Sequence, residues 1–162
     1  MVSQGVVKAT KVRYQMLFLV FVNVVINYMD RSNLAVAASD ISKEFNFTSV
    51  QMGLIFSAFS WTYLAFQIPG GILVKRYSPR ILYTVSLITW SLATVMQGFA
   101  RGLVTLCGLR MATGIFEAPS FPINNKVVSS WFPDNERASA IAIYTSGQFL
   151  GLAFLMPVLS SI

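Results

Sequence analysis

The chain has 162 residues, of which 55% are hydrophobic and 11% are charged, and its mean hydropathy is +0.63. Soluble domains carry about a quarter charged residues, so this composition excludes an ordinary soluble domain and indicates a membrane protein. The sequence has 12 Lys and Arg against 6 Asp and Glu, lacks histidine and has the single Cys107, which excludes an internal disulfide and a His/Cys metal site.

Five apolar windows predict five membrane helices, because each is close to the roughly 20 residues that cross about 30 Å of hydrocarbon. Residues 1–13 precede them as an N-terminal tail, and the windows cover residues 14–38, 50–74, 80–100, 103–127 and 137–162. Thr48 to Gln51 has the form of a capping box, and Ser78-Pro79 is typical of a helix start. The sequence therefore predicts an all-α membrane protein.

The basic residues between the windows and at their ends are divided unevenly between the two sides of the membrane. One side has only Lys43 and Arg101, whereas the other collects Lys8, Lys11, Arg13, Lys75, Arg76, Arg80, Lys126 and Arg137. By the positive-inside rule, we expect a multi-pass protein in the lipid bilayer with its N-terminus in the cytoplasm. Because topology accounts for the basic excess, no nucleic-acid partner is expected.

Four charged residues lie well inside the windows rather than at their ends or between them, namely Asp30, Arg31, Arg110 and Glu117. A charge at the bilayer centre costs about 2.5 to 3.5 kcal/mol, so we expect these four to be paired, hydrated or both. They are the first candidates for a functional site.

In the first window, a polar stripe at helical spacing comprises Asn23, Asn27, Asp30 and Arg31. Such a stripe should face protein or water. The alternative is that the helix ends at Met29 and leaves the charges at the outer interface. Against it, residues 14–29 are short for a span and residues 34–38 resume the apolar run.

In the fourth window, Arg110 and Glu117 lie two turns apart on one helix face, with Gly114 between them. The missing side chain of Gly114 leaves space either for a ligand or for a closely packed helix, and both interpretations stay open. Two prolines within residues 119–122 remove backbone donors directly after the glutamate. Because freed carbonyls in a membrane need protein or water, this pattern predicts a water-lined cavity beside Glu117.

The last window adds the polar residues Tyr144, Thr145 and Gln148. Gly147 and Gly151 form a GxxxG pattern on the same helix, which is also typical of simple helix packing. This window alone does not separate a ligand contact from a packing contact.

Several stretches resemble the major facilitator superfamily, in its anion:cation symporter family, among them NYMDRSNLAVAA (27–38), GLRMATGIFEAPSFPINN (108–125) and YTSGQFLGLAFLMP (144–157). The resemblance implies twelve helices in two six-helix halves, with substrate near the midplane between them. About five of those helices are present here, so we expect a partial N-terminal half whose partner is a C-terminal half outside this chain. The loop after the second window departs from the superfamily pattern, because Lys75 replaces the usual aspartate and Ser78 the usual glycine.

The resemblance also implies roles for single residues. Asp30 and Glu117 would be the proton-coupling pair, and Arg31 and Arg110 would bind the substrate anion. Contacts to substrate hydroxyls would come from Tyr28 and Gln148, and possible lining residues are Asn27, Gly114, Asn124 and Tyr144. Asn124 either touches substrate or satisfies the proline-broken helix.

The implied function is secondary active transport, in which protons drive import of a sugar-acid anion, D-galactonate first, across a bacterial inner membrane. No cofactor is expected, the proton is the coupling ion, and the chain is not expected to be an enzyme. One alternative is a carrier for another organic anion, such as glucarate, a hexuronate or an aromatic carboxylate. Another is a non-transporting membrane subunit.

Overall fold

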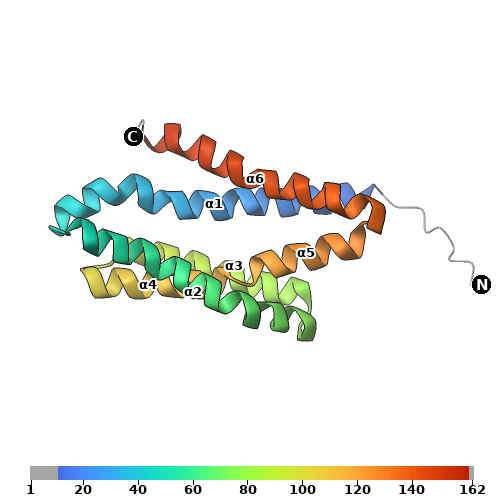
Figure 1. The fold of residues 1–162 in the computed structure, drawn as a ribbon, viewed down its shortest axis with the longest axis horizontal. Coiled ribbons are helices and arrows are strands. Elements are labelled where there is room, and N and C mark those ends of the chain that lie inside the picture. The colour runs from blue at the N-terminus through green and yellow to red at the C-terminus, as the bar shows by residue number, and fades with distance from the viewer. Residues whose placement is uncertain (1–10, 161–162) are drawn as a thin grey trace, which may run out of the picture.

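The computed structural model describes the backbone of residues 11–160 and the side chains of residues 11–153, and within that range it is helical without strands (Figure 1). The helices are α1 (Val12–Glu44), α2 (Ser49–Arg76), α3 (Pro79–Gln97), α4 (Leu103–Glu117), α5 (Ser120–Trp131) and α6 (Asp134–Ser160). Residues 1–10 of the predicted tail and 161–162 of the last window lie outside the described range.

The helices pack in two groups joined by α5 (Figure 1). In one group α1 lies along α6, and in the other α4 lies against both α2 and α3. The bundle has two apolar clusters: the first comprises Leu17, Val20, Val24, Val128, Phe132, Ala140 and Tyr144, and the second, in which α1 meets α2 and α4, comprises Leu34, Met52, Ile55 and Leu106. On α1 the first cluster ends at Val24 and the second begins at Leu34, so Asn27, Asp30 and Arg31 of the polar stripe lie between two apolar cores.

Helix α1 runs unbroken for 33 residues from Val12 to Glu44, through Asp30 and Arg31. The alternative in which the helix ends at Met29 is therefore wrong. The continued apolar run explains the difference, because Leu34 packs into the second cluster and holds this part of the helix in the bundle. The two charges thus lie in the middle of a helix.

The predicted fourth helix, residues 103–127, is split into α4 and α5 at Ala118-Pro119, and α5 extends to Trp131. The last amide of α4 is that of Ala118, which donates to Gly114 O at 3.1 Å, whereas Pro119 has no N–H to continue the ladder. The chain then restarts with Ile123 N donating to Pro119 O at 3.0 Å. This break directly follows Glu117.

The start of α2 has the predicted capping box. Gln51 N donates to Thr48 Oγ1 at 3.3 Å, and Thr48 N donates to Gln51 Oε1 at 2.8 Å. Helix α3 starts with Pro79 at its first turn, but Ser78 makes no side-chain capping bond. Sequence signals thus located both helix starts.

Large apolar side chains cover the outside of the bundle, and the most exposed of them include Val50, Trp61, Ile68, Phe99 and Val104. Such an extensive apolar surface is typical of contact with lipid rather than water. Among the described residues, α1 alone is both long enough and apolar enough to count as a span from its length and composition. The other predicted spans rest on the exposed surface and on relatedness to known proteins, described below.

The basic residues gather at one end of the bundle. The start of α1, the α2–α3 connection and the α5–α6 connection all lie at this end (Figure 1). There Arg13 pairs with Glu136 at 2.8 Å and Arg137 pairs with Asp134 at 2.8 Å. The two ends of the bundle therefore differ in charge as the loop pattern predicted.

Candidate functional site

An ion pair between α1 and α4 lies at the centre of the bundle. Arg31 donates to Glu117 Oε1 twice, from Nε at 2.9 Å and from Nη2 at 2.6 Å. Glu117 is only 1% exposed, whereas 24% of the Arg31 side chain is exposed. The second carboxylate oxygen of Glu117, Oε2, is buried and has no hydrogen-bond partner among the described residues. One oxygen thus holds the arginine and the other is free to bind a proton or water.

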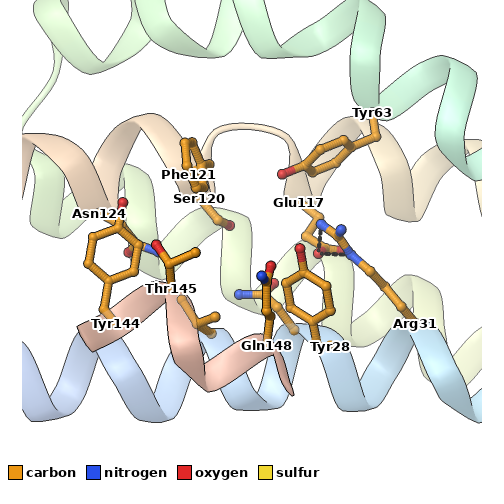
Figure 2. A pocket seen from close by; sticks show the side chains of 12 residues that line it. Tyr28, Arg31, Tyr63, Glu117, Ser120, Phe121, Asn124, Tyr144, Thr145 and Gln148 are labelled. Carbon is orange, nitrogen blue, oxygen red and sulfur yellow. Dashed lines mark hydrogen bonds and ion pairs between the residues drawn. The ribbon is translucent and has the colours of Figure 1, made fainter. Parts of the chain in front are cut away.

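Three aromatic rings surround the guanidinium of Arg31. Its central carbon lies 4.5 Å from the ring centroid of Tyr63, 4.8 Å from that of Tyr28 and 5.1 Å from that of Phe59. Tyr63 and Tyr28 approach the ion pair from opposite sides (Figure 2). Cation–π contacts hold a cation without neutralising it, so Arg31 is stabilised here independently of Glu117.

The ion pair forms one wall of a small cavity. Its volume is about 40 Å³, which is room for water but far below the roughly 300 Å³ at which ligand pockets begin. Five helices contribute its lining residues, which are Val24, Asn27, Tyr28, Arg31, Tyr63, Glu117, Ser120, Phe121, Asn124, Tyr144, Thr145 and Gln148 (Figure 2). The cavity enclosed by the described residues therefore has room for water but not for a larger ligand.

Seven of the ten residues selected from the sequence line this cavity: Asn27, Tyr28, Arg31, Glu117, Asn124, Tyr144 and Gln148. Some of them are also tied into the helix framework. Asn124 Oδ1 accepts a hydrogen bond from Tyr83 at 3.1 Å, and the Tyr144 hydroxyl donates to Asn125 Oδ1 at 2.7 Å. Asn124 thus faces the cavity and also ties α5 to α3.

The other two charges, those of Asp30 and Arg110, are absent from the lining of this cavity. Asp30 Oδ2 accepts a hydrogen bond from the indole Nε1 of Trp90 at 3.0 Å. Arg110 is 4% exposed, its guanidinium carbon lies 5.8 Å from the Phe59 ring centroid, and it makes no ion pair within the described residues. It acts electrostatically on both Glu117 and Asp30. Arg31, rather than Arg110, is therefore the cation that a ligand in this cavity can reach.

Gly114 is absent from the lining of this cavity and packs closely on α2, and its selection as a possible lining residue of the complete site stays a prediction. A Cβ placed there would overlap Thr62 Oγ1 and lie 2.6 Å from Phe59 O, because α4 packs closely on α2 at this point. Gly147 and Gly151 play the same part between α6 and α1, where added Cβ atoms would lie 3.1 Å from Phe21 O and 2.7 Å from Val25 O.

Sequence reasoning missed several residues at the site. Tyr63 was one of several polar residues on the second window, and nothing in the sequence alone distinguished it. Ser120 follows Pro119, and its buried hydroxyl has no partner among the described residues, so its place beside the helix break was the available signal. Trp90 gave no signal, because a tryptophan in an apolar helix usually packs or faces lipid.

Comparison with known proteins identifies a matching family and similar transporters. A family model described as Major Facilitator Superfamily matches residues 20–162. The chain is 56% identical over 147 residues to a D-galactonate transporter of Escherichia coli O6:H1 (strain CFT073), covering 91% of this chain and 34% of that protein. It is 42% identical over 158 residues to a probable galactarate/D-glucarate transporter of Escherichia coli (strain K12), covering 94% of this chain and 36% of that one.

A solved structure shares the fold. It is a bacterial homolog to the human lysosomal transporter Spinster, in an inward-facing and unoccupied conformation, with a TM-score of 0.82 and 28% identity. The match covers 88% of this chain and 30% of that one. The chain thus spans about a third of the length of all three relatives.

Proposed function

Because the chain belongs to the Major Facilitator Superfamily, a family of integral membrane transporters and not of enzymes, we propose that it forms the N-terminal part of a proton-coupled carrier for sugar-acid anions. D-galactonate is the first candidate substrate, since the relative with 56% identity is named a D-galactonate transporter. The rest of such a carrier would supply the second wall of the substrate site. This division agrees with a cavity too small for a sugar acid.

The Arg31–Glu117 ion pair in the cavity wall carries this proposal. Protonation of Glu117 removes the charge that holds Arg31, and the guanidinium fork then takes the substrate carboxylate through two parallel hydrogen bonds. The aromatic rings around Arg31 keep the cation in place while it exchanges one carboxylate for the other. Coupling is then competition between Glu117 and the substrate for one arginine.

Linkage makes this coupling reciprocal: the factor by which a proton tightens substrate binding is also the factor by which substrate tightens proton binding. Tyr28, Asn27 and Gln148 lie along the same cavity and offer polar groups to the substrate hydroxyls. Arg110, buried and unpaired within the described residues, contributes a fixed positive charge that favours anions in the site.

The basic end of the bundle supports an orientation with the N-terminus in the cytoplasm. Lys75, Arg76, Arg80 and Arg137 lie at that end with the start of α1, whereas Lys43 and Arg101 lie at the other. The membrane we propose is the bacterial inner membrane, since the two transporter relatives come from Escherichia coli.

The test is uptake of labelled D-galactonate by the full-length carrier in cells that lack their own sugar-acid carriers. We expect stronger accumulation at an outside pH of about 6 than at about 8, and its loss when a protonophore collapses the gradient. Uptake that is indifferent to both pH and protonophore, with the protein verified in the membrane, would reject proton coupling.

A second candidate substrate class is the sugar diacids, because the relative with 42% identity is a probable galactarate/D-glucarate transporter. Competition by unlabelled galactarate and glucarate in the same assay separates the two classes. Stronger competition by a diacid than by D-galactonate itself would move the assignment to the diacids.

A further inference from the structure

Trp90 makes the only hydrogen bond to the Asp30 side chain that the described residues provide. The indole lies on α3, is 1% exposed, and has Nε1 3.0 Å from Asp30 Oδ2 on α1. Its partner is sixty residues away in sequence, so the contact joins two helices. A fully buried tryptophan whose polar atom meets a carboxylate in the middle of a membrane helix is more than a packing residue.

The hydrogen bond from Trp90 differs in kind from the charged interactions around Asp30. Within the described residues, the charged groups that act on Asp30 are Arg110 and Glu117, both from α4. Its neighbour on α1, Arg31, is committed to Glu117 and to the aromatic rings. From α3 the contact is the neutral indole alone. Among the described residues, Asp30 is thus held by one donor and has no ion pair.

The chemistry of the indole group determines which protonation state of Asp30 this contact favours. An indole N–H donates and never accepts, so it can serve an ionised carboxylate fully but cannot take a hydrogen bond from the hydroxyl of a protonated one. Hydrogen bonds to a charged acceptor are roughly twice as strong as those to a neutral one. The contact therefore favours the ionised form of Asp30 over the protonated form.

We propose that Trp90 is a positioning residue for proton coupling: its N–H fixes the Asp30 carboxylate between α1 and α3 and promotes release of the proton from Asp30. This rests on the proposed function, in which Asp30 and Glu117 are the proton-coupling pair. Trp90 is absent from the lining of the cavity and its polar atom meets Asp30, so we expect it to act through Asp30.

The experiment replaces the N–H while keeping the shape of the side chain. In the full-length carrier, Trp90 is exchanged for its benzothiophene analogue, in which sulfur takes the place of the N–H, and Trp90→Phe is made alongside. Loss of one charge-assisted hydrogen bond corresponds to about a tenfold change in the proton equilibrium. We expect the pH midpoint of D-galactonate uptake to move upward by about one unit, while substrate exchange without a proton gradient stays within about twofold.

Trp61→Phe is the matched control, since Trp61 is 71% exposed on the outer surface of α2 and should alter neither quantity. Asp30→Asn distinguishes a failure of the role proposed for Asp30 from a failure of the role proposed for Trp90. If Asp30→Asn keeps proton-driven accumulation, the proposed role of Asp30 fails. If Asp30→Asn loses it but the analogue leaves the pH midpoint unchanged, the role of Trp90 is overturned and that of Asp30 stands. The role of Trp90 is overturned as well if Trp90→Phe lowers uptake, exchange and melting temperature together while the analogue behaves as the unsubstituted carrier.

Discussion

Replacing Gly114 by alanine tests whether this glycine is a packing contact or leaves room for a ligand. The added Cβ would overlap Thr62 Oγ1 and lie 2.6 Å from Phe59 O and 3.1 Å from Tyr63 N. Two of these three neighbours are backbone atoms of α2, which cannot move without the helix. The third is held as well, because the Thr62 hydroxyl donates to Ala58 O and Phe59 O, both at 3.0 Å.

The magnitude follows from two opposing effects. Alanine is a better helix former than glycine and should stabilise α4 by about 0.5 to 1 kcal/mol. Overpacking in a close-packed interior costs about 1 to 3 kcal/mol, and rigid backbone neighbours place this site toward the upper end. We expect Gly114→Ala to lower the free energy of unfolding by about 2 kcal/mol, which lowers the melting temperature by several degrees.

The assay is thermal unfolding of the purified full-length carrier in detergent, with and without D-galactonate. Gly108→Ala on the same helix is the control, because a Cβ there meets nothing within 4 Å and should leave the melting temperature equal or slightly higher. A Gly114→Ala carrier that melts with the control would refute the packing argument. If that variant also bound substrate more weakly, Gly114 would belong to the ligand site instead.

Four further substitutions address the charged residues and the fold. Glu117→Gln should keep substrate exchange but lose proton-driven accumulation, since an amide can still accept from Arg31 but cannot carry a proton; retained accumulation would exclude this residue as a proton carrier. Arg31→Lys should weaken D-galactonate affinity about tenfold, because one ammonium cannot copy the fork, and Arg110→Lys should weaken it less. Equal losses in a binding titration would contradict the assignment of Arg31 as the substrate cation. Thr48→Ala should cost about 1 kcal/mol through loss of the capping box and lower the melting temperature, with uptake per folded carrier unchanged.

Much of the helical architecture could be predicted, because apolar length in a membrane protein is a direct physical requirement. The unbroken first helix followed from the run after Arg31, and the capping box at Thr48 is as predicted. The sequence indicated a helix weakened by proline directly after Glu117, but residues 103–127 were predicted as one helix rather than two. Two prolines were visible in the sequence, but only packing determines whether a helix bends, continues or stops at Pro119.

Sequence reasoning selected seven residues that line the cavity, but it did not predict which charged residues pair with each other. Helical spacing placed Arg110 and Glu117 on one face of α4, yet Glu117 pairs with Arg31 of α1 while Arg110 is buried beside Phe59. Which arginine reaches the carboxylate depends on how α1 and α4 lie against each other, and a single-helix pattern does not contain that information. Trp90 was missed for the same reason, since its partner is on another helix.

The split between α4 and α5 also has a consequence for biosynthesis. With 15 and 12 residues, the two helices are about 22 and 18 Å long, and each is shorter than the hydrocarbon core of about 30 Å. Neither half can cross alone, so the insertion machinery must take both as one transmembrane unit. A substitution that weakens the connection between α4 and α5, such as a charge at Ala118, would first affect membrane insertion of the nascent chain. It would leave the α5–α6 connection on the wrong side of the membrane before any transport could be measured.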